Sequence, residues 1–197
     1  MMPKHEITRN DIMDRAAYAA VRAERRRAVT EMKKNRRISV GPDATFYFEN
    51  FETMCHQVHE MLYIEKGGED QIADELAAYN PMIPKGRNLA VTFMIEIEDA
   101  TRRARELMRL GGIEETISIS FDGETVKAVA EGDDERTTEA GKTSSVHFLL
   151  FPFTAKQIEK FRKPSQRVAI AIDHPNYGHM AVMPEAMRAS LAGDFDD

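Results

Sequence analysis

Alternating apolar and polar positions predict most of the strands in this chain. From Leu89 to Ile97 every second residue is large and apolar, which is typical of a strand with one buried face. Residues 116–121 and 125–130 have strand-forming composition and flank Asp122-Gly123, a dipeptide that favours a β-hairpin turn. Further strands are expected at residues 38–40, 44–49, 145–153, 167–173 and 180–183.

Apolar residues three and four positions apart predict the helices. The clearest helix spans residues 51–66, where Met54, Val58 and Leu62 share one stripe and Gly67-Gly68 ends the pattern. Residues 12–35 contain almost no helix breaker, and their apolar positions are mostly alanine. This pattern indicates one long helix, or two in series, lying across a surface rather than buried on all sides. Further helices are expected at residues 69–79, 98–110 and 155–161 and after residue 183.

The order of these elements predicts an α+β fold rather than a doubly wound parallel sheet. We expect a mostly antiparallel sheet of about six to seven strands, with helices packed on one face and a long basic N-terminal helix. A chain of 197 residues fits a single domain. We divide residues 1–197 into a basic helical N-terminal segment (1–37), an α+β core (38–192) and an acidic tail (193–197). The tail is expected to fray, and the polar residues 131–142 are expected to form a mobile loop.

The composition favours a cytoplasmic protein. With 42% hydrophobic and 30% charged residues, the chain can form a core and carry a polar surface. No apolar run approaches the roughly 20 residues that cross a bilayer, and the first residues lack the apolar stretch of a secretory signal. The single cysteine, Cys55, cannot form an internal disulfide, which favours a reducing compartment.

Positive charge is concentrated in residues 22–37. This segment carries a net charge of +6, whereas the whole chain carries −6, so the remainder carries −12. A basic helix on an acidic protein can dock a partner, or it can pair with acidic groups of its own chain. The net negative charge and the absence of interleaved aromatic residues argue against nucleic-acid binding. The candidate partner-binding residues are Arg22, Arg25, Arg26, Arg27, Lys33, Lys34, Arg36 and Arg37.

No complete catalytic or nucleotide-binding motif occurs. Gly141-Lys142-Thr143 is similar to the end of a phosphate-binding loop, but Arg136 stands where that motif needs a glycine. The segment that follows is also predicted to be a strand rather than a helix. Gly-x-Gly-x-x-Gly, Gly-x-Ser-x-Gly and Cys-x-x-Cys are absent as well. The sequence therefore assigns no enzymatic reaction.

The polar face of the 51–66 helix carries candidate metal ligands. His56 with His59, or His56 with Glu60, has the spacing that stacks two side chains over each other. The His-Glu-x-x-His pattern of zinc enzymes is missing, and most surface helices have a polar face, so a structural role is the commoner alternative. Cys55 lies on the apolar side and is expected to be buried and unreactive.

Ionisable residues also occur within the predicted strands. His147 shares a strand face with Leu149, and Glu96 shares one with Met94. His174 lies at the end of a strand, where functional residues are often placed. Half-buried ionisable groups on neighbouring strands either serve a site or pair with one another, and a hydrogen-bonded core histidine beside a carboxylate is the structural alternative.

Several short motifs then support a resemblance to a known family. They are Phe48-Glu49-Asn50, Gln57 and Glu60-Met61 with Glu65, Ala78-Tyr79-Asn80-Pro81 with Ile83-Pro84, Met94-Ile95-Glu96, Thr143-Ser144-Ser145-Val146-His147-Phe148 and Ile172-Asp173-His174-Pro175. In this order, and along nearly the whole chain, they resemble the bacterial domain-of-unknown-function family 3501. The resemblance implies no established activity. It does imply genomic neighbours, because members are often encoded beside a rubrerythrin-like di-iron protein and an iron–sulfur protein, which suggests redox or peroxide defence.

Two functional hypotheses follow from different classes. The resemblance includes Glu49, Gln57, Glu60, Glu65, Glu96, His147 and His174, whereas Cys55, His56 and His59 do not match it. In the first hypothesis the protein is a metal-handling accessory in redox or peroxide defence. Glu60, Glu96, His147 and His174 would then hold Fe or Mn, metals that suit mixed oxygen and nitrogen ligands. In the second the protein is a non-catalytic interaction module that docks a redox protein through its basic N-terminal helix.

Overall fold

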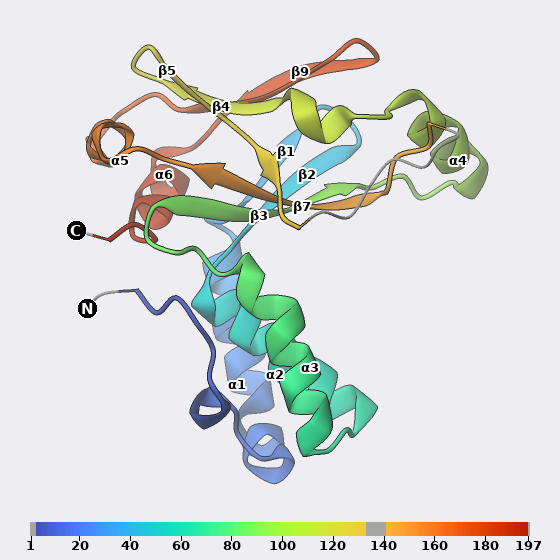
Figure 1. Cartoon of the computed structure of the whole chain (residues 1–197), viewed down its shortest axis with the longest axis vertical. Coiled ribbons are helices and arrows are strands. Elements are labelled where there is room, and N and C mark those ends of the chain that lie inside the picture. Colours follow the sequence, from blue (N-terminus) through green and yellow to red (C-terminus); the bar gives the residue numbers. More distant parts are fainter. Residues whose placement is uncertain (1–2, 133–140, 197) are drawn as a thin grey trace.

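The computed structural model describes residues 3–132 and 141–196, which form a strand-rich body and a projecting helical arm (Figure 1). One sheet has five strands in the order β1 (Arg37–Val40), β2 (Ala44–Glu49), β3 (Asn88–Ile95), β7 (Val146–Pro152) and β6 (Val129–Ala130). The other has four, in the order β5 (Glu124–Lys127), β4 (Ile117–Phe121), β8 (Ala169–His174) and β9 (Tyr177–Val182). All neighbouring strands in both sheets are antiparallel. The α+β prediction is confirmed.

The inner faces of the two sheets share one hydrophobic core. Phe93 of β3 lies opposite Phe46 on one side and His147 on the other, and all three are fully buried. Ile119 and Ile170 pair in the same way within the four-stranded sheet. Large alternating side chains from both sheets therefore bury each other, as in other packed pairs of sheets.

The predicted hairpin contributes to both sheets. Residues 124–127 pair with β4 as expected, but residues 129–130 pair with β7 of the five-stranded sheet. The chain thus passes from one sheet to the other between Lys127 and Val129. Alternation along a strand shows which face is apolar, but it does not show which sheet the strand joins.

Four shorter helical elements flank the sheets of the body. They are α4 (Ala100–Arg109), the 3-10 turn η3 (Ile113–Thr116), α5 (Ala155–Arg162) and α6 (Glu185–Ala192). Helices α5 and α6 lie together at one end of the body, and α4 lies at the other end (Figure 1). Residues 133–140, which belong to the predicted mobile loop, lie outside the described residues.

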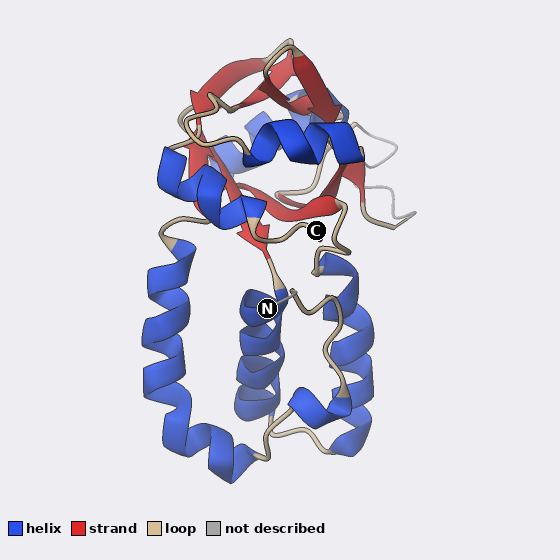
Figure 2. Cartoon of the chain, turned by 90° about the vertical axis from the view of Figure 1, so that its left-hand side faces the viewer, coloured by secondary structure: helices blue, strands red, loops and turns tan. Residues whose placement is uncertain are grey.

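The arm contains α1 (Arg15–Lys33), α2 (Phe51–Glu65) and α3 (Glu69–Tyr79), which extend away from the sheets (Figure 2). The 3-10 turns η1 (Arg9–Asp11) and η2 (Asn80–Met82) lie before α1 and after α3. A second apolar cluster joins the N-terminal segment, the arm and the five-stranded sheet. It contains Ile7, Ile12, Met54, Cys55, Val58, Met82, Ile83 and Ala90. Helix α1 buries only two of its side chains, Tyr18 and Val29, which agrees with its alanine-rich sequence.

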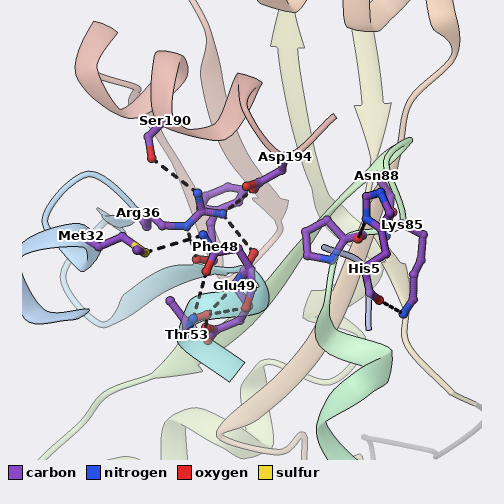
Figure 3. A network of polar contacts seen from close by, with 12 residues as sticks. His5, Met32, Arg36, Phe48, Glu49, Thr53, Lys85, Asn88, Ser190 and Asp194 are labelled. Carbon is purple, nitrogen blue, oxygen red and sulfur yellow. Dashed lines mark hydrogen bonds and ion pairs between the residues drawn. The ribbon is translucent and has the colours of Figure 1, made fainter. Parts of the chain in front are cut away.

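The C-terminal residues are held at the junction between body and arm, so the expectation of a frayed tail is wrong for residues 193–196. Phe195 is 2% exposed, and its ring packs against Phe153 and Phe161. Asp194 forms an ion pair with buried Arg36, as Figure 3 shows. A high acid content predicts a solvated tail, but here an aromatic ring and a buried cation hold it in place.

No helix within residues 3–132 and 141–196 is both long and apolar enough to cross a membrane.

Candidate functional site

Glu60, one of the predicted metal ligands, lies on α2 and faces α1. The Arg22 guanidinium donates from Nε and Nη2 to its two carboxylate oxygens, at 2.8 and 2.7 Å. The Tyr18 hydroxyl donates a third hydrogen bond at 2.7 Å. These hydrogen bonds lower the pKa of Glu60 to about 2, and the bonds from Arg22 have the largest effect. Glu60 is therefore an ionised carboxylate whose oxygens are both occupied by side chains of α1.

Glu96 and His147 lie on opposite faces of the five-stranded sheet. Glu96 follows the end of β3 on the exposed face, and the Tyr47 hydroxyl donates to it at 3.0 Å. His147 points into the core, where its Nε2 lies 2.9 Å from the Ser144 carbonyl oxygen. Its Nδ1 lies 3.7 Å from Oε2 of Glu114. His147 thus has the surroundings of a hydrogen-bonded core histidine beside a carboxylate.

His174 is largely buried at the end of β8. Its Nε2 lies 3.3 Å from the Gly111 carbonyl oxygen, and its Nδ1 accepts a hydrogen bond from the Asn176 backbone at 3.2 Å. Both ring nitrogens therefore contact the backbone around a turn. This arrangement joins the segment before η3 to the β8–β9 turn.

The four predicted metal ligands do not meet at one point. Glu60 belongs to the arm, whereas Glu96, His147 and His174 belong to the body. Across the part of the chain that the structure describes, no group of three or more His, Cys, Asp or Glu side chains is placed to hold a metal ion. These residues do not fit a single iron or manganese site, which needs several ligands close to one centre.

The histidines of α2 have structural contacts. His59 is 2% exposed, and its Nδ1 lies 2.7 Å from the Cys55 carbonyl oxygen while its Nε2 accepts from the Met13 backbone. Its ring stacks on Tyr18 with centroids 4.7 Å apart. Burial lowers the pKa of both His56 and His59. Cys55 is buried as expected, and burial raises its pKa to about 11.

A cavity of about 290 Å³ opens beside this cluster, at the outer end of the arm. It is lined by Arg9, Met13, Asp14, Arg15, Tyr18, His59, Leu62, Tyr63, Gly67, Gly68, Glu69 and Ile72. The Tyr63 ring contacts two guanidinium groups, and its centroid lies 4.5 Å from Cζ of Arg22 and 5.3 Å from Cζ of Arg15. Sequence reasoning did not single out this site. The available signal was Tyr18, a lone aromatic residue in an alanine-rich helix.

The basic segment of residues 22–37 divides into paired and unpaired cations. Three of them have carboxylate partners: Arg22 with Glu60, Lys34 with Glu31, and Arg36 with Asp194. Within the described ranges, the other five have no carboxylate at ion-pair distance. We call these five the basic surface: Arg25, Arg26, Arg27, Lys33 and Arg37. Arg26, Arg27 and Arg37 are exposed, and Arg25 and Lys33 are half-buried.

Comparisons with known proteins identify the family. Residues 6–195 match the family model described as protein of unknown function (DUF3501). The fold is similar to a crystal structure from Burkholderia pseudomallei that is described as a novel protein of unknown function. The sequences are 41% identical, the match covers 96% of this chain and 99% of the other, and the TM-score is 0.89. A comparison with curated proteins finds no match. Because the family match spans nearly the whole chain, the protein belongs to the DUF3501 family, as its motifs predicted.

Proposed function

We propose that this protein is a non-catalytic interaction module that docks an acidic partner protein through the basic surface on and next to α1. One observation carries the proposal. Five cations on or next to a projecting helix have no carboxylate partner in the described residues, although the chain outside residues 22–37 carries a net charge of −12. A chain with so many acids could have neutralised these cations internally, but within residues 3–132 and 141–196 only the other three have a carboxylate partner.

The form of the arm supports this role. Most of the surface of α1 is exposed, since only Tyr18 and Val29 are buried. Arg22, which lies among these cations, is held by Glu60 and fixes α1 against α2. A fixed helix presents its charges in a constant arrangement, which favours a specific partner over general attraction.

The resemblance suggests which partners to test. A rubrerythrin-like protein and an iron–sulfur protein are the expected candidates, and the partner's docking face would be acidic. The metal-handling role in redox or peroxide defence stays a prediction. It has less support than the docking role, because Glu60 lies in the arm and His147 in the body. Elemental analysis of protein purified without chelator or affinity tag separates the two roles. Near-stoichiometric iron or manganese that is lost in His147→Ala would favour metal handling over a pure docking role.

Charge reversal tests the docking proposal. We would purify the candidate partner and measure its Kd for the wild type and for R26E/R27E/R37E at low and high salt. The matched control is K156E/K163E/R167E, which reverses three exposed cations on the body. We expect wild-type affinity to fall steeply with salt, because exposed charges are screened. The α1 variant should bind at least tenfold more weakly at low salt, and the control should bind like the wild type. Equal affinity of both variants, or binding that does not depend on salt, would refute the role of the basic surface.

A further inference from the structure

The cavity at the outer end of the arm is built from segments that are distant in the sequence. The N-terminal segment contributes Met13, α1 contributes Tyr18, α2 contributes Leu62, and α3 contributes Ile72. At about 290 Å³ it lies near the lower limit of typical ligand pockets. Its volume therefore suits a compact molecule.

Part of the cavity lining is apolar, and its aromatic part is held in place. Met13, Leu62, Ile72 and the Tyr18 ring provide the apolar contacts. Tyr18 is 1% exposed, its ring stacks on His59, and its hydroxyl donates to Glu60. Because these groups are already satisfied, this part of the lining does not need to rearrange when a ligand enters, and this lowers the cost of binding.

Most polar groups that line the cavity are already engaged. Arg9 donates to both oxygens of Glu69, at 2.8 and 2.6 Å. Asp14 caps α1 by accepting from two backbone N–H groups. His59 uses both ring nitrogens. These side chains are therefore poorly suited to bind a further polar group.

Arg15 is the exception among the charged groups of the lining. Its guanidinium lies over the Tyr63 ring, and within residues 3–132 and 141–196 it has no carboxylate at ion-pair distance. The neighbouring N-terminus of α3 also has no side-chain cap, since Gly68 occupies the capping position. Both features add positive potential beside the apolar part of the lining, whereas the lining carboxylates of Asp14 and Glu69 are engaged by the α1 backbone and by Arg9.

We propose that this cavity binds a small monocarboxylate with a compact apolar body, with the apolar body against Leu62 and Ile72 and the carboxylate on Arg15. An aromatic or branched aliphatic acid has this chemistry. The site is distinct from the basic surface, because Arg15 is not part of that surface, and it does not depend on the proposed docking role.

Titration followed by NMR on the whole protein tests the site. Benzoate is the probe, benzamide supplies the same shape without the charge, and acetate supplies the charge without the apolar body. We expect benzoate to shift the methyl resonances of Leu62 and Ile72 in a saturable manner. Benzamide should bind about tenfold more weakly, because it loses the charge-assisted contact with Arg15, and acetate should not saturate.

Two variants locate the carboxylate contact. Arg15→Gln removes the proposed cation, and Arg27→Gln removes an exposed arginine of the same helix that does not line the cavity. Benzoate should bind R15Q about tenfold more weakly and R27Q as tightly as the wild type. The proposal is overturned if benzoate causes no saturable shift at Leu62 and Ile72. It is also overturned if benzamide binds as well as benzoate, or if R15Q binds like the wild type.

Discussion

The ion pair between Arg36 and Asp194 gives the sharpest test of how this protein is held together. Both side chains are buried, at 2% and 9% exposed, and they join the start of β1 to the C-terminal residues. Arg36 also donates to the carbonyl oxygens of Phe48 and Glu49, each at 3.0 Å (Figure 3). We expect Asp194→Ala to destabilise the protein strongly, because it leaves a buried guanidinium without its carboxylate.

The magnitude follows from the surroundings of Arg36. Removing one partner of a buried ion pair costs about 3–5 kcal/mol. The two carbonyl acceptors remain, so we expect a value near the lower limit, about 3 kcal/mol. For a chain of this size that corresponds to a decrease in Tm of about 6–12 °C. Asp194→Asn keeps one acceptor oxygen for Arg36, so its Tm should decrease less than that of Asp194→Ala.

Urea unfolding followed by far-UV circular dichroism measures this effect. Asp173→Ala is the control, because Asp173 is an exposed acid on β8, and its free energy of unfolding should stay within about 0.5 kcal/mol of the wild type. The R36L/D194A double variant should lose less stability than the sum of the single variants, since the two groups interact. If the free energy of unfolding of D194A lies within about 0.5 kcal/mol of the wild-type value, the ion pair of the tail does not stabilise the fold and the reasoning fails.

Three further predictions concern the tail, the arm and the cysteine. Phe195→Ala should cost about 3–5 kcal/mol in urea unfolding, because the ring packs against Phe153 in the core. Hydrogen bonds from Arg22 and Tyr18 hold the pKa of Glu60 near 2, below its ordinary value of 4.5. The ionised Glu60 therefore stabilises the folded protein fully above about pH 4.5, and this stabilisation is lost as the pH falls toward 2. Urea midpoints should therefore fall less between about pH 5 and pH 2 in Glu60→Gln than in the wild type. The raised pKa and burial of Cys55 should make its reaction with a thiol reagent slow in native protein at pH 8 and fast in urea, and fast native reaction would contradict the structure.

The local elements of this protein follow from its sequence. The stripe through Met54 and Val58 and the Gly67-Gly68 stop predicted a helix over residues 51–66, and α2 spans Phe51–Glu65. The alternation that begins at Leu89 predicted β3 in the same way. The spacing of apolar residues depends on which side of a helix or strand is buried. A short stretch of sequence is therefore enough to predict the element and its apolar face.

The sequence also identified individual residues whose importance only the structure explains. Glu60 and His147 stood out as ionisable groups in structured segments, and both are engaged in specific contacts. Their proposed meeting around one metal ion does not occur in the described residues. The distance between a helix of the arm and a strand of the core depends on how the two pack, and neither segment encodes that distance by itself.

Tertiary structure alone decided how the elements are assembled. The residues after Lys127 leave one sheet for the other, the acidic tail is held by Arg36, and the cavity of the arm combines Met13 with Ile72. Each of these features joins segments far apart along the chain. The sequence by itself determined the helices, the strands, their apolar faces and the clustering of positive charge, because those depend on nearby residues. The sheet partners, the buried ion pair and the cavity depend on which apolar faces cover one another, which is settled only when the whole chain packs.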